Sequence, residues 1–433
     1  MTPLEYGIVG CLLLVVLLLS SMPVAFVMGV IGVAGFAAVI NTPAALSMMS
    51  AELVGTFSSK SLTVIPLFVF MGQVAFHSGI SRRLFDAAYH WLGPLPGGMA
   101  MATVGACTGF GAICGSGPAT AATMASVALP EMKRYGYDDE LATGSVAAGG
   151  SLGMLIPPSV VFICYGVLTE QSVGKLFVAG IGPGLLIALL FCLMIYVRCR
   201  LKPSRGPVSP PFAWRRKVLA LAGVFETLLL FVLVMGGLFL GYFTPTEAAA
   251  VGAAGSLIVA LARRGLTWTT LRRSLLETVR TSCMVLAIVA GAVIFGRFLA
   301  VTTIPTELAA WLAGLPLPGW GIMALVIFFY LVCGCFVDAL ALLLLTVPIF
   351  YPVVTGLGYD PIWFGVMIVV VTQMGVISPP VGVNVYVVSG IERDVPLHTV
   401  FRGAVPFLLA LVLAAAILLA FPGITLFLPR LVQ

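Results

Sequence analysis

The chain has 433 residues, of which 61% are hydrophobic and only 9% are charged. Soluble domains are about 45–50% apolar and about 25% charged, so this composition excludes a soluble enzyme, a disordered protein and a nucleic-acid-binding protein. The net charge of +6 comes from 22 Lys and Arg against 16 Asp and Glu. On a membrane protein such residues mostly mark the loops that face the cytoplasm. We therefore expect a polytopic membrane protein in which the lipid bilayer solvates most side chains.

Metal-dependent or nucleophilic chemistry has no support in the residue types. The nine cysteines lie mainly in apolar runs, and the chain has only three histidines. Their spacing matches neither a zinc site nor a disulfide framework. No nucleophile with its base and no pair of aspartates is recognisable either. We therefore predict that the protein is not an enzyme.

Ten apolar runs are long enough to cross the membrane, whose hydrocarbon core of about 30 Å requires about 20 helical residues. In chain order these runs are residues 4–20, 22–40, 62–80, 141–168, 174–198, 218–242, 246–262, 278–303, 361–391 and 399–428.

Two further apolar segments are interrupted at their centres. Residues 98–131 contain a glycine-rich break at 111–118, and residues 319–355 contain Cys333-Gly334-Cys335 followed by Asp338. Two half-length helices joined by a flexible centre predict a re-entrant hairpin rather than a straight span. Such backbone is tolerated at membrane depth only where it is buried in protein or lines a cavity.

The chain matches itself at one constant shift, the shift that places Pro23 on Pro245. The further matches are residues 94–97 with 316–319, Pro130 with Pro352, residues 136–138 with 358–360, Gly153 with Gly375, and Pro157-Pro158 with Pro379-Pro380. They require no gap, and several fall at the helix breaks. Self-similarity at a fixed offset indicates structural repeats. We assign residues 1–200 to the first repeat, 201–217 to a basic cytoplasmic linker and 218–433 to the second repeat.

Each repeat contains five crossings and one hairpin, so the second repeat is predicted to be inverted relative to the first. The basic residues agree with this inverted arrangement. If the N-terminus is periplasmic, most of the basic residues between Arg82 and Arg273 fall in cytoplasmic loops. Cytoplasmic loops carry the excess of Lys and Arg. We therefore predict that both termini are periplasmic, that the hairpins enter from opposite faces and that their tips meet near the midplane.

A short segment precedes each hairpin, at residues 82–92 and 306–315. The first mixes charged residues with Leu84, Phe85 and Trp91, a pattern typical of helices that lie along the membrane interface. We interpret both segments as interfacial arm helices. The alternative is a plain loop.

The first polar constellation joins the tip of hairpin 98–131 to the span 141–168. The tip holds Ser116 and Thr120, and the span contains Gly149, Gly153 and Pro157-Pro158. A double proline removes two N–H donors, so the span must break and leave carbonyls free. Positive N-termini of half-helices attract anions, and free carbonyls coordinate Na⁺. The alternative is a capped helix kink without a ligand.

The second constellation joins hairpin 319–355 to the span 361–391. Gly334 and Asp338 lie at the tip, and the broken span carries Thr372, Gly375, Ser378 and Asn384. An acidic residue at membrane depth is costly, and it is by default a functional hypothesis. A carboxylate beside carbonyl oxygens suits Na⁺. The alternative is that Asp338 only caps the returning half-helix.

At these residues the chain resembles the large membrane subunit of tripartite ATP-independent periplasmic (TRAP) transporters, the DctM-like permeases, over essentially its whole length. The stretches that carry the resemblance are residues 65–68, 115–123, 155–159, 174–177, 243–250 and 378–384.

The resemblance implies an all-helical inner-membrane transporter that imports an organic acid by Na⁺ symport, with an elevator-like movement of the domain that bears the hairpins. It also implies a small four-helix membrane subunit and a periplasmic substrate-binding protein as partners. For this chain the resemblance implies two Na⁺ sites. One comprises Ser116, Gly149, Gly153 and Pro157, and the other comprises Gly334, Asp338, Thr372 and Gly375. Family members often have Thr where this chain has Ser378 and Ala339.

We expect a small carboxylate or sulfonate to bind between the tips, held by hydroxyl groups and half-helix N-termini. The expected substrate-binding residues are Ser116, Thr120, Ser159, Ser378 and Asn384. One alternative is a stand-alone Na⁺/carboxylate symporter of the same broader fold, which needs no binding protein. A more distant alternative is a channel or a subunit of a proton pump.

Overall fold

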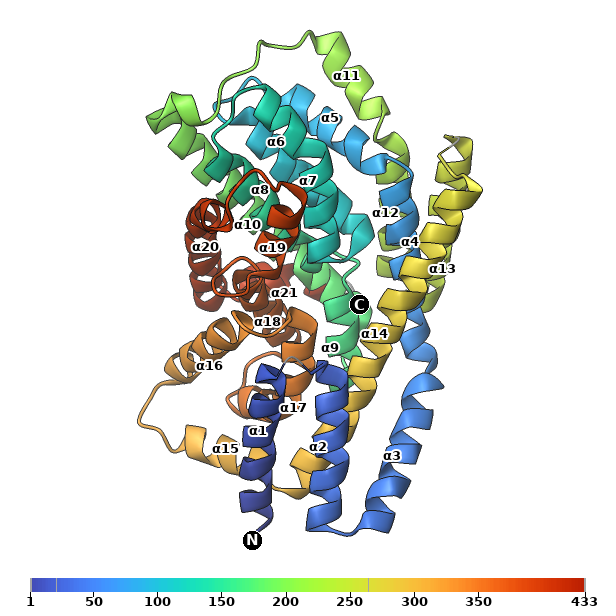
Figure 1. Ribbon diagram of the computed structural model, residues 1–433, viewed down its shortest axis with the longest axis vertical. Coiled ribbons are helices and arrows are strands. Elements are labelled where there is room, and N and C mark those ends of the chain that lie inside the picture. Colours follow the sequence, from blue (N-terminus) through green and yellow to red (C-terminus); the bar gives the residue numbers. More distant parts are fainter. Residues whose placement is uncertain (1, 21, 264, 432–433) are drawn as a thin grey trace.

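The computed structural model describes residues 2–20, 22–263 and 265–431. Within these ranges the chain forms α-helices and three short 3₁₀ helices, and no strand occurs. The predicted all-helical class is confirmed. Figure 1 shows an elongated bundle with the N-terminus at one end of its long axis.

The N-terminal part contains one helix that the hydrophobic pattern did not predict. It comprises α1 (Pro3–Leu19), α2 (Val24–Val39), α3 (Thr42–Phe57), η1 (Lys60–Thr63) and α4 (Val64–His77). Helix α3 was missed because its polar and apolar residues alternate without a long apolar run. Asn41 starts it, since the Asn41 side chain accepts a hydrogen bond from the N–H of Ala44.

Next come α5 (Ile80–Leu92) and the helix pair α6 (Gly98–Cys114) and α7 (Gly117–Arg134). The break between α6 and α7 falls inside the predicted range 111–118. Gly115 adopts φ +64° there, a left-handed conformation that costs glycine little. Pro118 lies in the first turn of α7, where a missing N–H has no consequence.

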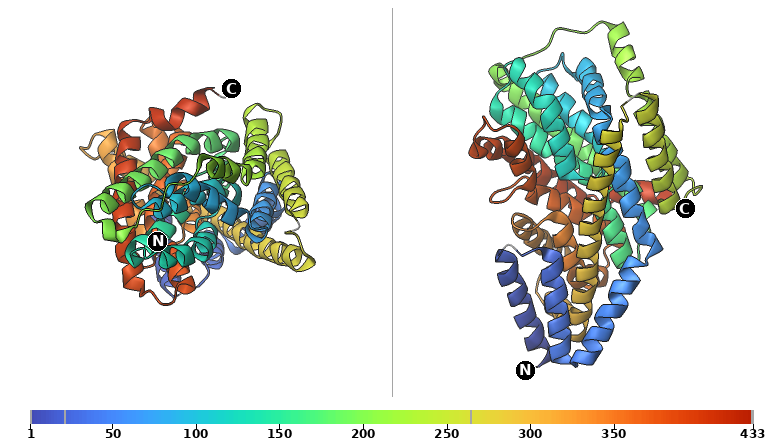
Figure 2. Two further views of the ribbon diagram at one scale, coloured as in Figure 1. Left: turned by 90° about the horizontal axis from the view of Figure 1, so that it is seen from above. Right: turned by 45° about the vertical axis from the view of Figure 1, so that its right-hand side comes forward.

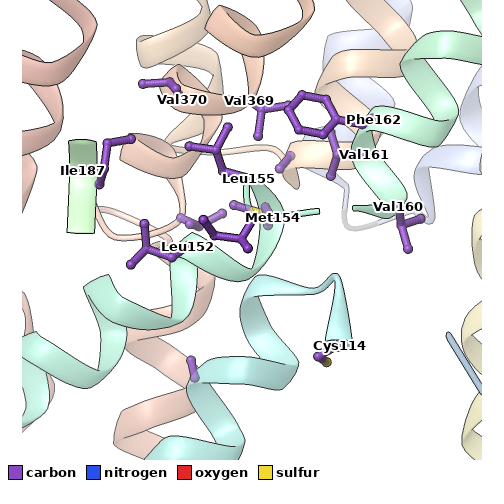
Figure 3. Close-up of a cluster of buried hydrophobic side chains, with 14 of the residues drawn as sticks. Cys114, Leu152, Met154, Leu155, Val160, Val161, Phe162, Ile187, Val369 and Val370 are labelled. Carbon is purple, nitrogen blue, oxygen red and sulfur yellow. The ribbon is translucent and has the colours of Figure 1, made fainter. Parts of the chain in front are cut away.

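The segment 141–168 is a broken helix, as predicted. It consists of α8 (Asp139–Ser151), η2 (Leu152–Met154) and α9 (Val160–Thr169), and α10 (Val173–Leu201) follows. Apolar side chains surround the break, and Figure 3 shows Leu155 pointing toward Phe162 and Val369. The break is therefore fixed by tight packing on several sides.

The region from 203 to 262 differs from its predicted boundaries. It forms η3 (Pro203–Arg205), α11 (Trp214–Ala222), α12 (Phe225–Phe239) and α13 (Pro245–Ala262). The predicted span 218–242 is wrong at its start, because the chain bends by 49° between α11 and α12. The first turn of α11 holds three consecutive basic residues, which keep this helix out of the apolar core.

Helix α14 (Trp268–Val301) has 34 residues and begins ten residues before the predicted span 278–303. At 1.5 Å per residue it is about 51 Å long, which exceeds the hydrocarbon core. Its first turns are polar, so they do not belong to the apolar run that predicts the span. The short helix α15 (Ile304–Ala313) follows at the predicted second arm.

The C-terminal elements are α16 (Gly319–Gly334), α17 (Ala339–Gly356), α18 (Pro361–Gly375), α19 (Val383–Ile391), α20 (Leu397–Ala420) and α21 (Gly423–Leu431). Their order parallels that from α6 to α10, and the shift that places Pro23 on Pro245 also places the starts of α7 and α8 on those of α17 and α18. In Figure 1 the α6–α7 pair lies toward the end that holds α5 and α11, and the α16–α17 pair lies toward the end that holds α15. The predicted single run 399–428 is wrong, since the chain breaks between α20 and α21.

The number of helices that can cross the bilayer differs from the ten predicted crossings. Of the helices that the structure describes, six are long and apolar enough to cross a bilayer alone, and the number is seven if the bent α11–α12 pair forms one span. The other apolar helices have 10–17 residues. The difference arises partly because two of the predicted spans are each divided into two short helices.

The core of the bundle is formed by the two broken segments. Almost every residue of α8 and α18 is buried. Helix α14 packs on α2 and α4, and α4 also packs on α13. Figure 2 shows these helices as a wall along one side of the bundle. Helix α6 of the first hairpin packs on α4, and α17 of the second packs on α14, so both hairpins lie beside this wall.

Candidate functional site

A cavity of about 300 Å³ lies where the tips of both hairpins meet. Residues 114–119 from the first tip and residues 338–340 from the second tip line it, together with side chains of α4, α9 and α14. The sequence predicted that the two tips converge, and this juxtaposition is present. The cavity therefore joins segments from the two halves of the chain.

The first tip presents the N-terminus of α7 to the cavity. Ser116 occupies the N-cap position, but its side chain makes no capping hydrogen bond. The adjacent Gly115 packs so tightly that a Cβ there would lie 2.5 Å from the carbonyl oxygen of Pro158. A helix N-terminus without a side-chain cap offers N–H groups and a partial positive charge to an anion.

The second tip presents a carboxylate to the same cavity. Asp338 caps α17, and its Oδ2 atom accepts hydrogen bonds from the N–H groups of Leu340 (3.0 Å) and Ala341 (3.5 Å). Its Oδ1 atom accepts no hydrogen bond from the described residues. One carboxylate oxygen is therefore free for a cation, while the other holds the helix start.

The wall of the cavity contains polar residues that sequence reasoning missed. Gln73 of α4 and Thr281 of α14 line it beside Met284. A signal existed for Gln73, because it is an amide within an apolar run. No sequence signal distinguishes Thr281 from the other hydroxyl residues of α14.

Part of the predicted first Na⁺ site comes together at the first tip. A Cβ on Gly153 would lie 2.8 Å from the carbonyl oxygen of Ser116 and 2.5 Å from Oγ1 of Thr120. In the described chain no backbone N–H donates to the carbonyls of Pro157 or Pro158. Gly149 lies one turn away and packs against Cys107 of α6. Free carbonyls are thus present, whereas Gly149 lies apart from them.

The predicted second Na⁺ site has the same arrangement. A Cβ on Gly375 would lie 2.3 Å from the carbonyl oxygen of Gly334, so the tip and the break are in direct contact. The N–H of Val381 also donates to the carbonyl of Cys335 at 3.3 Å. Thr372 is buried, and its hydroxyl donates to the carbonyl of Val369 at 2.9 Å.

The five predicted substrate-binding residues do not all line the cavity. Ser116 does. Thr120 donates to the carbonyl of Ser116 at 2.8 Å, Ser159 caps α9, and Ser378 donates to the carbonyl of Gly375 at 3.2 Å. Asn384 is buried, and its Nδ2 donates to the carbonyl of Ala147 at 3.0 Å. Small hydroxyl side chains readily bond to nearby backbone, so sequence spacing alone does not fix where they point.

A second buried amide, Gln373, was not singled out from the sequence. Its Nε2 donates to the carbonyl of Ser151 at 3.1 Å. Gln373 and Asn384 therefore both run from the second half of the chain to carbonyls of α8. Among the described residues the carbonyl oxygens of both side chains are buried and have no partner.

The whole chain was compared with known proteins. It matches the family described as "Tripartite ATP-independent periplasmic transporter, DctM component" over residues 11–424. It is 38% identical to the C4-dicarboxylate TRAP transporter large permease protein DctM of Pseudomonas aeruginosa, over 90% of this chain and 91% of that protein. It is 34% identical to the sialic acid TRAP transporter large permease protein SiaM of Vibrio cholerae, over 96% of each.

The fold is similar to that of the YdaH transporter of Alcanivorax borkumensis, with a TM-score of 0.67 over 98% of both chains. At 15% identity this likeness concerns the fold alone. The family match and the two relatives extend over nearly all of the sequence. The chain therefore belongs to the DctM component of the tripartite ATP-independent periplasmic transporters, and it is a multi-pass membrane transport protein and not an enzyme.

Proposed function

We propose that this chain carries a small organic acid across the bacterial inner membrane by Na⁺ symport, using the cavity between the hairpin tips. The observation that supports this most is that one cavity is lined by both an uncapped helix N-terminus and a free carboxylate oxygen. The first feature favours an anion, and the second favours a cation. Their proximity provides a physical basis for binding both together.

The proposed substrate is a small carboxylate or sulfonate. The two relatives are named for C4-dicarboxylates and sialic acid, and both of these are carboxylates. Ser116 and the N–H groups at the start of α7 would hold the acid group. Thr120, Ser159, Ser378 and Asn384 bond to backbone, so they would contact substrate only after rearrangement.

We place Na⁺ at the two tips, where it would be bound mainly by neutral oxygens. The first site would use Ser116, Gly153 and Pro157, with Gly149 supporting the helix. The second would use Gly334, Asp338, Thr372 and Gly375. No cluster of His, Cys, Asp and Glu occurs in the described chain, and backbone carbonyls with one carboxylate are suitable ligands for Na⁺.

We also propose that residues 1–200 and 218–433 are inverted repeats and that transport follows an elevator mechanism. The recurrence of element boundaries at one constant shift supports the repeats. The hairpins and broken segments would move as one body against α1, α2, α12, α13 and the arms α5 and α15. Both termini would be periplasmic, and residues 201–217 cytoplasmic.

The proposed partners are a small four-helix membrane subunit and a periplasmic substrate-binding protein. Family membership supports both. The alternative is a stand-alone Na⁺/carboxylate symporter, and transport by the isolated chain decides between the two.

The test is uptake of radiolabelled C4-dicarboxylate into proteoliposomes. The liposomes contain the chain alone, the chain with its small subunit, or both with the binding protein, each with an inward Na⁺ or K⁺ gradient. We expect uptake only with all three proteins and Na⁺. Uptake by the isolated chain would support the stand-alone symporter. Equal uptake with K⁺ would contradict Na⁺ coupling.

A further inference from the structure

Helix α11 leaves several apolar side chains exposed, among them Val218, Leu219 and Leu221. None of its nine residues is buried, and Leu219 is 60% exposed. The basic residues Arg215, Arg216 and Lys217 follow Trp214 in its first turn. A short helix with exposed apolar residues beside basic ones is typical of a segment that lies in the membrane interface. The bend of 49° into α12 is consistent with this position.

Aromatic contacts hold α11 against the arm helix α5. The rings of Trp91 and Trp214 meet edge to face with centroids 5.5 Å apart. Trp91 donates from Nε1 to the carbonyl of Lys217 at 3.3 Å, and the Lys217 ammonium lies 5.6 Å from the Trp91 ring centroid. Tryptophan favours the level of the lipid headgroups. Figure 1 shows α5 and α11 together at one end of the molecule.

Between these helices lies an open hollow of about 340 Å³. Arg83, Asp86 and His90 line it from α5, and Arg216 and Leu219 line it from α11. Two arginines and one aspartate are thus the charged residues of the lining, which carries an excess of positive charge.

The two arginines are not equivalent. Arg83 lies 3.4 Å from a carboxylate oxygen of Glu226, which is also paired with Arg263. Arg216 is exposed, and its guanidinium bonds to no side chain of the described residues. Arg216 is thus the basic group of the hollow that is most available to an external anion.

We propose that this hollow binds the phosphate headgroup of an anionic phospholipid, with the acyl chains lying along the exposed apolar face of α11. Basic clusters on amphipathic helices attract anionic lipids. A soluble anion would use the arginines but not Leu219, whereas a phospholipid satisfies both the charge and the apolar surface. The tryptophan pair sets the hollow at headgroup depth.

The test is native mass spectrometry of the full chain released from nanodiscs that contain equal amounts of phosphatidylglycerol and phosphatidylcholine. We expect one retained phosphatidylglycerol in preference to phosphatidylcholine. Arg216→Gln should weaken retention about fivefold, as expected for the loss of one basic residue near a lipid surface. The matched control is Arg273→Gln, which removes an exposed charge at the start of α14 and should leave retention unchanged.

A second variant, Leu219→Asn, tests the apolar contribution without a change of charge. It should also reduce retention, because it removes apolar surface beside the headgroup. Equal retention by Arg216→Gln and the wild type would overturn the proposal, as would equal losses in the Arg273→Gln control. A competition experiment adds 10 mM inorganic phosphate, on the order of a saturating amount for a weak anion site. If phosphate abolishes lipid retention while Leu219→Asn leaves it unchanged, the hollow binds a soluble anion and the proposal is overturned.

Discussion

The side-chain amide of Gln373 donates a hydrogen bond to the main-chain carbonyl of Ser151, which lies 222 residues earlier in the chain. The same offset relates the two double prolines and the starts of α7 and α17. Gln373 therefore contacts its own counterpart in the other half of the chain. In a structure built from two repeats related by a two-fold axis, equivalent residues contact each other only near the axis. This contact supports the proposed inverted repeat, whose axis would pass close to Ser151 and Gln373.

Replacement of Gln373 tests the importance of this contact. Gln373→Met leaves the Ser151 carbonyl without its donor, but it also removes a buried carbonyl oxygen that has no partner in the described chain. We expect a small loss, about 1 kcal/mol. Gln373→Glu places a buried carboxylate against that carbonyl, so it should cost at least twice as much.

Thermal denaturation in one detergent checks this order of wild type, Gln373→Met and Gln373→Glu. The control is Gln73→Glu, at a position that lines the cavity and is only partly buried. A Gln373→Glu variant as stable as Gln373→Met would contradict the expectation.

The helix breaks were predictable from the sequence because their causes are local. Glycine at the first tip adopts positive φ, and the double prolines cannot donate hydrogen bonds, whatever lies around them. Helix α3 and the early start of α14 were not predictable from hydrophobicity. Both segments have tertiary partners instead: Glu52 of α3 pairs with Arg297 at 2.7 Å, and near the start of α14 the Ser274 hydroxyl donates to the carbonyl of Gln73 at 3.4 Å.

The site was predictable at the level of segments but not of side chains. Proximity of the tips follows from the predicted inverted repeat, whereas the direction of a hydroxyl depends on which backbone group lies nearest. Ser159 illustrates this, since it bonds within its own segment and not toward the cavity. Gln73 and Thr281 join the site through the packing of α4 and α14 against the tips, which no local pattern encodes.

The close contact between Gly375 and Gly334 leaves no room for a side chain at position 375. Gly375→Ala would place a methyl group 2.3 Å from the Gly334 carbonyl oxygen, so the second tip must shift. We expect a loss of about 1–3 kcal/mol in stability, together with loss of uptake. The control is Gly390→Ala in α19, where a Cβ meets nothing within 4 Å and where alanine should stabilise by up to about 1 kcal/mol. Thermal denaturation and uptake of the two variants check this, and equal behaviour would refute the contact.

Asp338 is expected to set the Na⁺ dependence of transport. Asp338→Asn keeps an oxygen that can cap α17 but removes the negative charge from the cavity. We expect the Na⁺ concentration for half-maximal uptake to rise about tenfold or more, which corresponds to the loss of one charge-assisted contact. The control is Asp360→Asn, since Asp360 caps α18 through the N–H groups of Ile362 and Trp363 and lies outside the cavity. An unchanged Na⁺ dependence in Asp338→Asn would exclude the carboxylate as a ligand.

An ion pair joins the end of α7 to the loop after α19 and makes the fold sensitive to pH. The Lys133 ammonium lies 2.8 Å from Asp394 and 3.2 Å from Glu392. The hydrogen bond and charge of Lys133 lower the pKa of Asp394, and the hydrogen bonds that Lys133 donates to the two carboxylates raise the pKa of Lys133. A lowered acid pKa stabilises the fold above the unfolded value of about 3.9 and ceases to do so as the pH falls through the folded value.

The raised pKa of Lys133 acts at the other end of the range. Its contribution is complete below the unfolded value of about 10.4 and is lost as the pH rises through the higher folded value. The stability difference between wild type and Lys133→Gln should therefore be small and constant between about pH 5 and 9, and it should shrink below about pH 4. It should also shrink in 1 M salt, on the order of the concentration that screens exposed charges. Thermal denaturation across pH checks this, with Lys202→Gln, at another exposed lysine, as the control. A difference that persists at low pH and high salt would show that the aliphatic stem of Lys133 stabilises the fold by packing and not by charge.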